Sequence, residues 1–314
     1  MIIPFTFHIC VSTIRLHSCV LHSSLDSFII KSFYHFSSII DPHFKTFDDH
    51  LFSYHGQCDL LLTRSDSFAH GLGLHVHIRT TRVSSPHMDY SYISGIAVKI
   101  GPDTLEVSGD GKLIVNGHST VFPEFTDNIA FAHTVYTITK TLMGDKQRIV
   151  AYNLDLGEDI DSSIQIRVNT NKSMLFVDMN GAFADSEGLL GAALEEGKPL
   201  FARDGITDLT GHWNTYGEEW QVNDTDPKLF QDSHRHPQYP VGCLYTTMAE
   251  KNMATMSHVR RRLEDTGITH IVGLQEASKA CSHLDDDRMK DFCVNDIMAT
   301  GDLDLVEDPF YANA

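Results

Sequence analysis

The chain has 314 residues, of which 42% are hydrophobic and 21% are charged, and its formal net charge is −18. This composition is typical of a soluble globular protein, and the length allows two ordinary domains or one large domain with an appendage. The acidic excess argues against nucleic acids and anionic membranes as partners, because both would be repelled. No stretch approaches the ~20 apolar residues that a membrane-spanning helix needs.

Residues 1–40 differ from the rest of the chain. They are rich in Phe, Ile, Ser and His, contain no Gly, and keep neither a strand nor a helix period. A secretory signal needs a basic start and an unbroken apolar run, but no basic residue precedes Arg15 and His and Ser interrupt the apolar runs. We expect a truncated or wrongly joined start that is not folded, with a poor signal peptide as the alternative.

From residue 41 onward the pattern is that of short β-strands. Leu74, Val76 and Ile78 alternate with polar residues, which is the period-2 signature of a half-buried strand. The Asp110–Gly111 and Asn116–Gly117 pairs suit tight hairpin turns, since Asn, Asp and Gly tolerate a positive φ. Further strands are expected over residues 134–141, 148–154, 164–169 and 174–179.

About ten or more short strands with no helical period between them predict a mainly β fold, an antiparallel β-sandwich. A parallel α/β fold is disfavoured because no amphipathic helix separates the strands.

After Cys243 the apolar residues recur at helical spacing. Helices are expected over residues 248–263, over 271–281 with Thr269 as its cap, and over 289–297. The chain is therefore divided into five parts, which are an N-terminal segment (1–40), a β domain (41–230), a linker (231–242), a small α-helical module (243–306) and a tail (307–314).

Three motifs in the β domain resemble the von Willebrand factor type D domain family. DPHFKTFDDHLFSYHGQC (41–58) is similar to the opening of that domain, GLLGAALEEGK (188–198) to its Gly-Leu-Cys-Gly loop, and YGEEWQV (216–222) to its Phe-Gly-x-x-Trp-x-Val motif. The order and spacing of the motifs extend the resemblance over residues 41–243. The helical tail resembles a reduced form of the cysteine-containing module that often follows in this family.

The resemblance implies a disulfide framework with one bridge missing. The family cysteine in the Gly-Leu-Cys-Gly loop is replaced by Leu190, and its expected partner is also absent. The resemblance implies the pairs Cys58–Cys243 and Cys281–Cys293, whereas six reduced cysteines in a cytosolic protein are the alternative.

The resemblance also implies a structural calcium ion, and no other cofactor is expected. Calcium takes six to eight oxygen ligands. Asp41 occupies the family position, but Ala192, Ala193 and Leu194 replace the usual loop ligands, so Asp204 and Asp208 are the substitutes considered, together with Glu195 and Glu196. An acidic, solvated loop without a metal is the alternative.

The remaining sequence patterns give little evidence for a transition-metal site or a catalytic site. His75 and His77 lie on one side of a predicted strand, a spacing that can chelate zinc or copper, but the sequence offers no obvious third ligand and 19 histidines make such pairs common. No nucleophile-and-base motif and no phosphate-binding loop occurs.

These observations favour a non-enzymatic, extracellular or cell-surface interaction domain used in adhesion or assembly. A secreted hydrolase using Asp/His chemistry is the alternative. Expected partners are other proteins, or matrix and cell-surface components, and the assembly state stays open. Asn171 and Asn223 lie in glycosylation sequons, which are usable if the chain is secreted.

Overall fold

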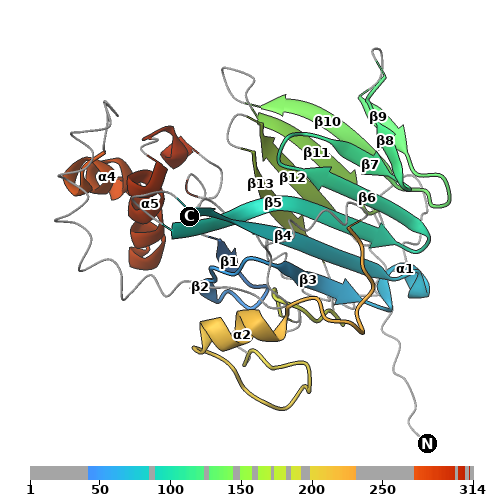
Figure 1. Cartoon of the computed structure of the whole chain (residues 1–314), viewed down its shortest axis with the longest axis horizontal. Coiled ribbons are helices and arrows are strands. Elements are labelled where there is room, and N and C mark those ends of the chain that lie inside the picture. Colours follow the sequence, from blue (N-terminus) through green and yellow to red (C-terminus); the bar gives the residue numbers. More distant parts are fainter. Residues whose placement is uncertain are drawn as a thin grey trace, which may run out of the picture. The chain divides into compact units, whose positions relative to one another are not determined.

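The computed structural model confirms the mainly β fold. It describes residues 42–84, 89–123, 127–143, 149–157, 162–170, 173–181, 185–191, 199–230, 272–300, 303–307 and 311, all within the compact unit formed by residues 33–314. These residues form thirteen strands in three antiparallel sheets and a few small helices (Figure 1).

The larger sheet has six strands in the order β3-β4-β5-β6-β7-β8, so each strand pairs with its neighbour along the chain. The long strands β4 and β5 are its second and third strands and pair along their whole length, with one register shift after Arg79. The bounds of the six strands are Asp59–Ser65, Leu74–Ser84, Asp89–Ile100, Asp103–Ser108, Leu113–Val115 and His118–Thr120.

The second sheet has five strands in the order β13-β12-β11-β10-β9. A separate hairpin pairs β1 (His43–Lys45) with β2 (Leu51–Ser53). The bounds of strands β9 to β13 are Asn128–Ala130, Thr137–Met143, Ile149–Asp155, Ser163–Asn169 and Met174–Asn180.

The inward faces of the two large sheets share one hydrophobic core, which makes the expected sandwich. Leu74, Val76 and Ile78 of β4 are fully buried in this core, together with Ile164 and Ile166 of β12. The predicted alternation along β4 is therefore confirmed on its inner side.

The two predicted hairpin turns occur where the sequence places them. Residues 109–112 connect β6 to β7, and Asp110 accepts a hydrogen bond from the Lys112 amide at 3.2 Å. Asn116 and Gly117 connect β7 to β8 with φ values of 48° and 80°, a left-handed pair that Asn and Gly adopt at little cost.

The described helices are short. They are α1 (Phe68–Gly71), α2 (Trp213–Glu219), α4 (Leu274–Ala280), α5 (Asp287–Thr300) and the 3-10 turns Cys281–His283 and Leu303–Glu307. α4 and α5 correspond to the second and third predicted C-terminal helices. The first one, over 248–263, lies outside the described residues, as does the linker.

The C-terminal helices pack against the outer side of the second sheet. Met174 and Phe176 of β13 share a small core with α4 and α5. Tyr311, in the expected tail, is fully buried in this core. Tyr311 therefore contributes to the fold of the helical module.

Tyr54 explains why two motif glycines are needed. Its side chain is fully buried, and a Cβ atom added at Gly56 or at Gly217 would overlap its ring. Tyr216, next to Gly217, donates a hydrogen bond from its hydroxyl to the Gly188 carbonyl at 3.0 Å. The three sequence motifs thus meet around two tyrosines.

We expect Gly217→Ala to destabilise the protein by about 1–3 kcal/mol, because overpacking against Tyr54 outweighs the gain in helix propensity. Urea unfolding measures the change. Gly273→Ala is the matched control, since a Cβ there meets nothing within 4 Å, and it should cost under about 1 kcal/mol. Equal stabilities for the two variants would contradict this account of the motif.

Candidate functional site

The outer edge of β3 is closed by two chain segments that lie far along the sequence. Arg64 and Glu187 exchange two backbone hydrogen bonds of 2.7 and 2.9 Å, and the Leu189 amide donates to the Leu61 carbonyl at 3.0 Å. Farther along the edge, the Leu61 amide donates to the Trp220 carbonyl at 2.8 Å. An exposed strand edge would invite pairing with another chain, so these segments protect it.

Between the two closing segments the chain makes a short hairpin, residues 199–211, called the clamped hairpin below. The Ala202 amide donates to the Thr207 carbonyl and the Leu209 amide to the Leu200 carbonyl. At the tip, Asp204 accepts hydrogen bonds from the amides of Ile206 and Thr207, each at 2.8 Å. The turn therefore has a defined shape, and it presents the side chain of Ile206 with 82% of its surface exposed.

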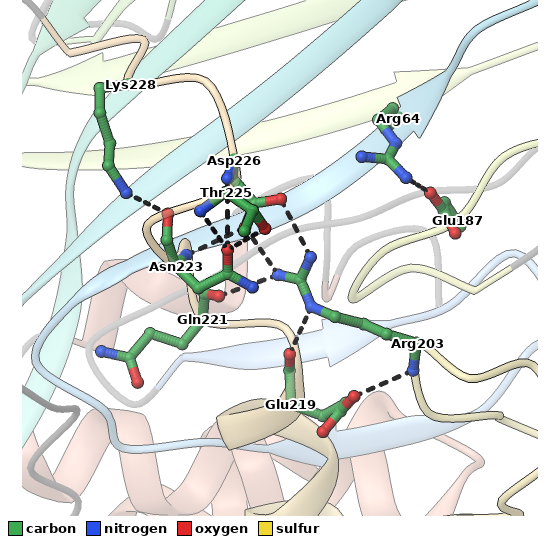
Figure 2. A network of polar contacts seen from close by, with 9 residues as sticks. All are labelled: Arg64, Glu187, Arg203, Glu219, Gln221, Asn223, Thr225, Asp226 and Lys228. Atoms are coloured by element: carbon green, nitrogen blue, oxygen red, sulfur yellow. Dashed lines mark hydrogen bonds and ion pairs between the residues drawn. The ribbon is translucent and has the colours of Figure 1, made fainter.

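Arg203 holds the turn of the clamped hairpin in place (Figure 2). Its guanidinium makes a two-point ion pair with Asp226 at 2.9 and 3.0 Å. It also donates to the carbonyls of Glu219 and Gln221 at 2.8 and 2.9 Å, and it lies over the Trp220 ring at 5.1 Å. Two-point Arg–carboxylate pairs combine charge attraction with fixed geometry, so this residue joins the hairpin to the chain after α2.

Asp226 stays ionised in this arrangement. Burial raises its pKa, but hydrogen bonds from Arg203 and from the Asn223 amide outweigh burial, and the pKa of Asp226 is lowered overall. The ion pair with Arg203 therefore persists well below neutral pH.

The segment that follows, residues 222–230, lies on the outer face of the larger sheet and is called the strap below. Leu229 and Phe230 pack on Ala97 of β5, and the guanidinium of Arg79 lies 4.1 Å from the centre of the Phe230 ring. The Val222 amide donates to the Asp59 carbonyl at 2.9 Å. The strap thus covers a face that the alternating sequence predicts to be polar and exposed.

His77 lies on this face, and the structure differs from the half-buried strand that we predict. His77 is only 1% exposed. Among the described residues, neither ring nitrogen has a hydrogen-bond partner. Burial, with a smaller contribution from His75, lowers the pKa of His77 from 6.5 to about 4, so the ring is neutral at pH 7.

The described residues do not assemble the predicted metal sites. No three His, Cys, Asp or Glu side chains among them form a group suited to a metal ion. Hydrogen bonds from Thr207 lower the pKa of Asp204, and those from Thr210 lower the pKa of Asp208. Both carboxylates thus serve turns of the clamped hairpin, and Asp41 lies outside the described residues.

Asp48 is an acidic residue of the opening motif that sequence reasoning did not select as a ligand. It is 4% exposed, and a Cβ added at Gly191 would lie 3.3 Å from its Oδ2 atom. The adjacent Phe47 amide donates to the Leu190 carbonyl at 2.9 Å. The structure therefore brings Asp48 beside the Gly-Leu-Leu-Gly loop.

Cys281 and Cys293 form a disulfide with their Cα atoms 5.9 Å apart, which is the pairing implied by the resemblance. Cys58 is also disulfide-bonded, and its expected partner Cys243 lies outside the described residues. Asn223 is exposed and accepts hydrogen bonds from the Thr225 amide and hydroxyl. The other sequon residue, Asn171, lies outside the described residues.

A line of polar groups joins the β1–β2 hairpin to the helical module. His43 Nδ1 lies 2.6 Å from the Ser53 hydroxyl, and His43 Nε2 lies 3.3 Å from Asp296 Oδ1. The Tyr311 hydroxyl donates to the other oxygen of Asp296 at 2.6 Å, and the His43 ring stacks on Phe292.

The order of these groups is that of a Ser–His–Asp triad, but the His43 and Asp296 side chains are only 2% and 0% exposed. A catalytic base must reach a proton on the substrate. This line therefore serves to dock the helical module and does not support the hydrolase alternative.

Comparison with known families identifies the β domain. The family model described as "von Willebrand factor type D domain" matches residues 38–192. Over these residues the chain is a von Willebrand factor type D domain, as the motifs predict. Members of this family are typically extracellular, generally non-enzymatic, and mediate protein interactions. No curated protein matches the chain.

The matched range ends before the clamped hairpin, α2 and the strap. The structure nevertheless joins these parts to the matched domain, because Tyr216, Trp220 and Val222 belong to the same hydrophobic core as the two sheets. The described helices include none that is long and apolar enough to span a bilayer.

We expect Arg203→Met to lower the free energy of unfolding by about 3 kcal/mol, because it leaves the buried Asp226 carboxylate without its partner. Urea denaturation at pH 7 measures this change. The control is Arg64→Met, which breaks the half-exposed Arg64–Glu187 pair and should cost under about 1 kcal/mol. A smaller loss of unfolding free energy for Arg203→Met than for Arg64→Met would contradict the role of Arg203 in holding the hairpin.

Proposed function

We propose that the chain is a non-enzymatic extracellular or cell-surface domain that binds other proteins in adhesion or assembly. The match of residues 38–192 to the von Willebrand factor type D domain carries this proposal. Disulfide bonds at Cys58, Cys281 and Cys293 support it, because stable disulfides are typical of oxidising compartments. The exposed sequon at Asn223 supports it as well, and we propose Asn223 as a glycosylation site.

The roles of the motif residues support a binding scaffold rather than an enzyme. Tyr54, Gly56, Gly188, Tyr216 and Gly217 make the packing contacts described above. These residues thus stabilise the sandwich and help to close the edge of β3. Such a rigid frame is suited to presenting loops to a partner.

Within this function we propose the clamped hairpin as a contact surface. Arg203 and Asp204 fix its shape before binding, which lowers the entropy lost on association. Ile206 at 82% exposure and Phe201 at 39% supply apolar area, and the ionised Asp204 and Asp208 flank them. These features fit a protein partner that has an apolar socket with basic side chains at its rim.

Competition for a natural surface tests this proposal. Purified fluorescent chain should bind saturably to the extracellular matrix of the source cells, and excess unlabelled chain should displace it. Ile206→Ser should compete at least tenfold less well, because about 1.5–3 kcal/mol of apolar burial is lost.

Val135→Ser is the matched control, since Val135 is 91% exposed and lies outside the hairpin, and it should compete like the wild type. Equal competition by both variants would refute the contact surface. Absence of saturable binding would refute the adhesion function itself.

We also propose that calcium stabilises the domain through Asp48. The support is the position of this buried carboxylate beside Gly191, because calcium prefers clustered carboxylate and carbonyl oxygens. When bound, the ion would tie the opening motif to the Gly-Leu-Leu-Gly loop. Asp204 and Asp208 are not part of this proposal, since their turns already use their carboxylates.

Melting with calcium and with chelator tests the calcium proposal. An ion that binds only the folded state stabilises it by about 2.7 kcal/mol at a concentration of 100 times its Kd, so calcium should raise the Tm by roughly 5–10 °C. Asp48→Asn should abolish this rise, whereas Asp204→Asn should keep it. An unchanged Tm of the wild type would rule out the ion and leave the adhesion proposal intact.

A further inference from the structure

We propose that residues 222–230 form an acid-released strap, with His77 beneath it as the group whose protonation favours release. The proposal concerns local opening of the strap and holds whether or not the clamped hairpin binds a partner. It rests on the burial of His77, on the segment that covers it, and on the few bonds that attach this segment to the sheet.

His77 has a tightly enclosed position on β4, between the edge strand β3 and β5. It lies opposite Leu61 of β3 and Ala97 of β5 in the strand register. Its ring carries two buried nitrogens without a hydrogen-bond partner among the described residues. A polar group in such a site is tolerated only in its neutral form, because burying an unpaired charge is expensive.

The strap supplies part of this enclosure. Leu229 and Phe230 pack on Ala97, the cross-strand neighbour of His77. Gly95 leaves room for the Phe230 ring, since a Cβ there would lie 3.2 Å from it. Lifting the strap would therefore expose this face of the sheet, and with it His77, to water.

The strap is anchored at its start, by Val222 in the core and by Asp226 on Arg203, and is weakly attached beyond Asp226. Within the described part of the chain, its backbone donates one hydrogen bond to the sheet, from Val222 to Asp59. Its other polar contacts lead to Arg203 or stay within the strap, as the Lys228–Asn223 contact does. Segments with few backbone bonds open at lower free energy than the sheet core, so local release is possible without unfolding.

The charged groups around His77 come from each neighbouring element. Burial disfavours the protonated ring most, His75 and Lys228 add to this effect, and together they outweigh Asp59 and Asp226, which favour protonation. His75 itself has a lowered pKa, for which burial is the main cause and Arg64 and Lys99 minor ones, opposed by Asp66 and Asp226. Among the described residues, two further charges contact the strap, Arg79 of β4 through Phe230 and Arg203 through Asp226.

The sign of the pH effect follows from these groups. With the strap closed, His77 takes up a proton only near pH 4, whereas an exposed His does so near pH ~6.5. The open state therefore binds more protons between these values, and opening becomes easier as the pH falls through this window. From pH 7 to pH 5 the opening equilibrium should rise roughly twentyfold. The Arg203–Asp226 pair stays charged over this range, so it is not the group that titrates.

Hydrogen exchange followed by mass spectrometry tests the proposal on the intact chain. After correction for intrinsic exchange rates, peptides that cover residues 222–230 should lose protection roughly twentyfold between pH 7 and pH 5. Peptides of β11 and β12 should keep their protection. Constant protection of the strap, or an equal loss in β11 and β12, would overturn the proposal.

Two variants separate His77 from the other titrating groups. His77→Leu should show no pH-dependent change in strap protection, because the titrating group is gone and the apolar side chain tolerates burial. His118→Gln, a change at an exposed histidine of β8, should retain the full change. A roughly twentyfold loss of strap protection between pH 7 and pH 5 in a folded His77→Leu variant would overturn the role of His77.

A measurement on the wild-type chain keeps the test valid if His77→Leu does not fold. The His77 ring can be followed by NMR as the pH is lowered from 7.5. A ring that remains neutral to below pH 5 while strap protection falls supports the proposal. A ring that titrates near pH 6.5 while the strap stays protected overturns it.

Discussion

The outer edge of β3 needs protection from pairing with other chains, and the arrangement of the segments that follow the sandwich strands depends on this need. A strand edge must be paired, covered or otherwise protected, and here two segments that follow the sandwich strands in sequence supply the hydrogen bonds. The Gly188 backbone reaches this edge closely, because a Cβ there would lie 2.7 Å from the Leu62 carbonyl oxygen. Edge closure thus fixes where α2, the clamped hairpin and the strap must lie.

This closure also explains how a loop outside the sheets acquires a defined shape. The clamped hairpin lies between the two closing segments in the sequence, and both closing segments are bonded to the same strand. Arg203 adds a third anchor through Asp226 and two carbonyls. A loop held in this way loses little entropy on binding, which is what a protein-binding surface requires.

Two ionisable residues near the strap show opposite responses to burial. Asp226 keeps its charge because Arg203 and the Asn223 amide donate hydrogen bonds to it, which lowers its pKa despite burial. His77 has no such partners among the described residues, so burial favours its neutral form. The Arg203–Asp226 pair, which is insensitive to mild acid, therefore holds the strap near a ring on β4, His77, that is sensitive to it.

The period-2 pattern and the turn residues of the sequence determined the strands, the hairpins at Asp110–Gly111 and Asn116–Gly117, and the antiparallel class. The motifs determined the family, and helical spacing indicated α4 and α5. These features depend on neighbours within a few residues, which a linear pattern records well.

Only the tertiary structure decided which polar residues are buried and what they contact. Nothing in the sequence near His77 indicates that the strap, about 150 residues later, packs on Ala97, the cross-strand neighbour of His77. Likewise, Arg203, Asp226 and Asp48 resemble many other charged residues in an acidic chain, whereas Asp204 and Asp208 resemble metal ligands until their turns are seen. Long-range contacts assign these roles, because burial and pairing depend on segments that meet only in the folded chain.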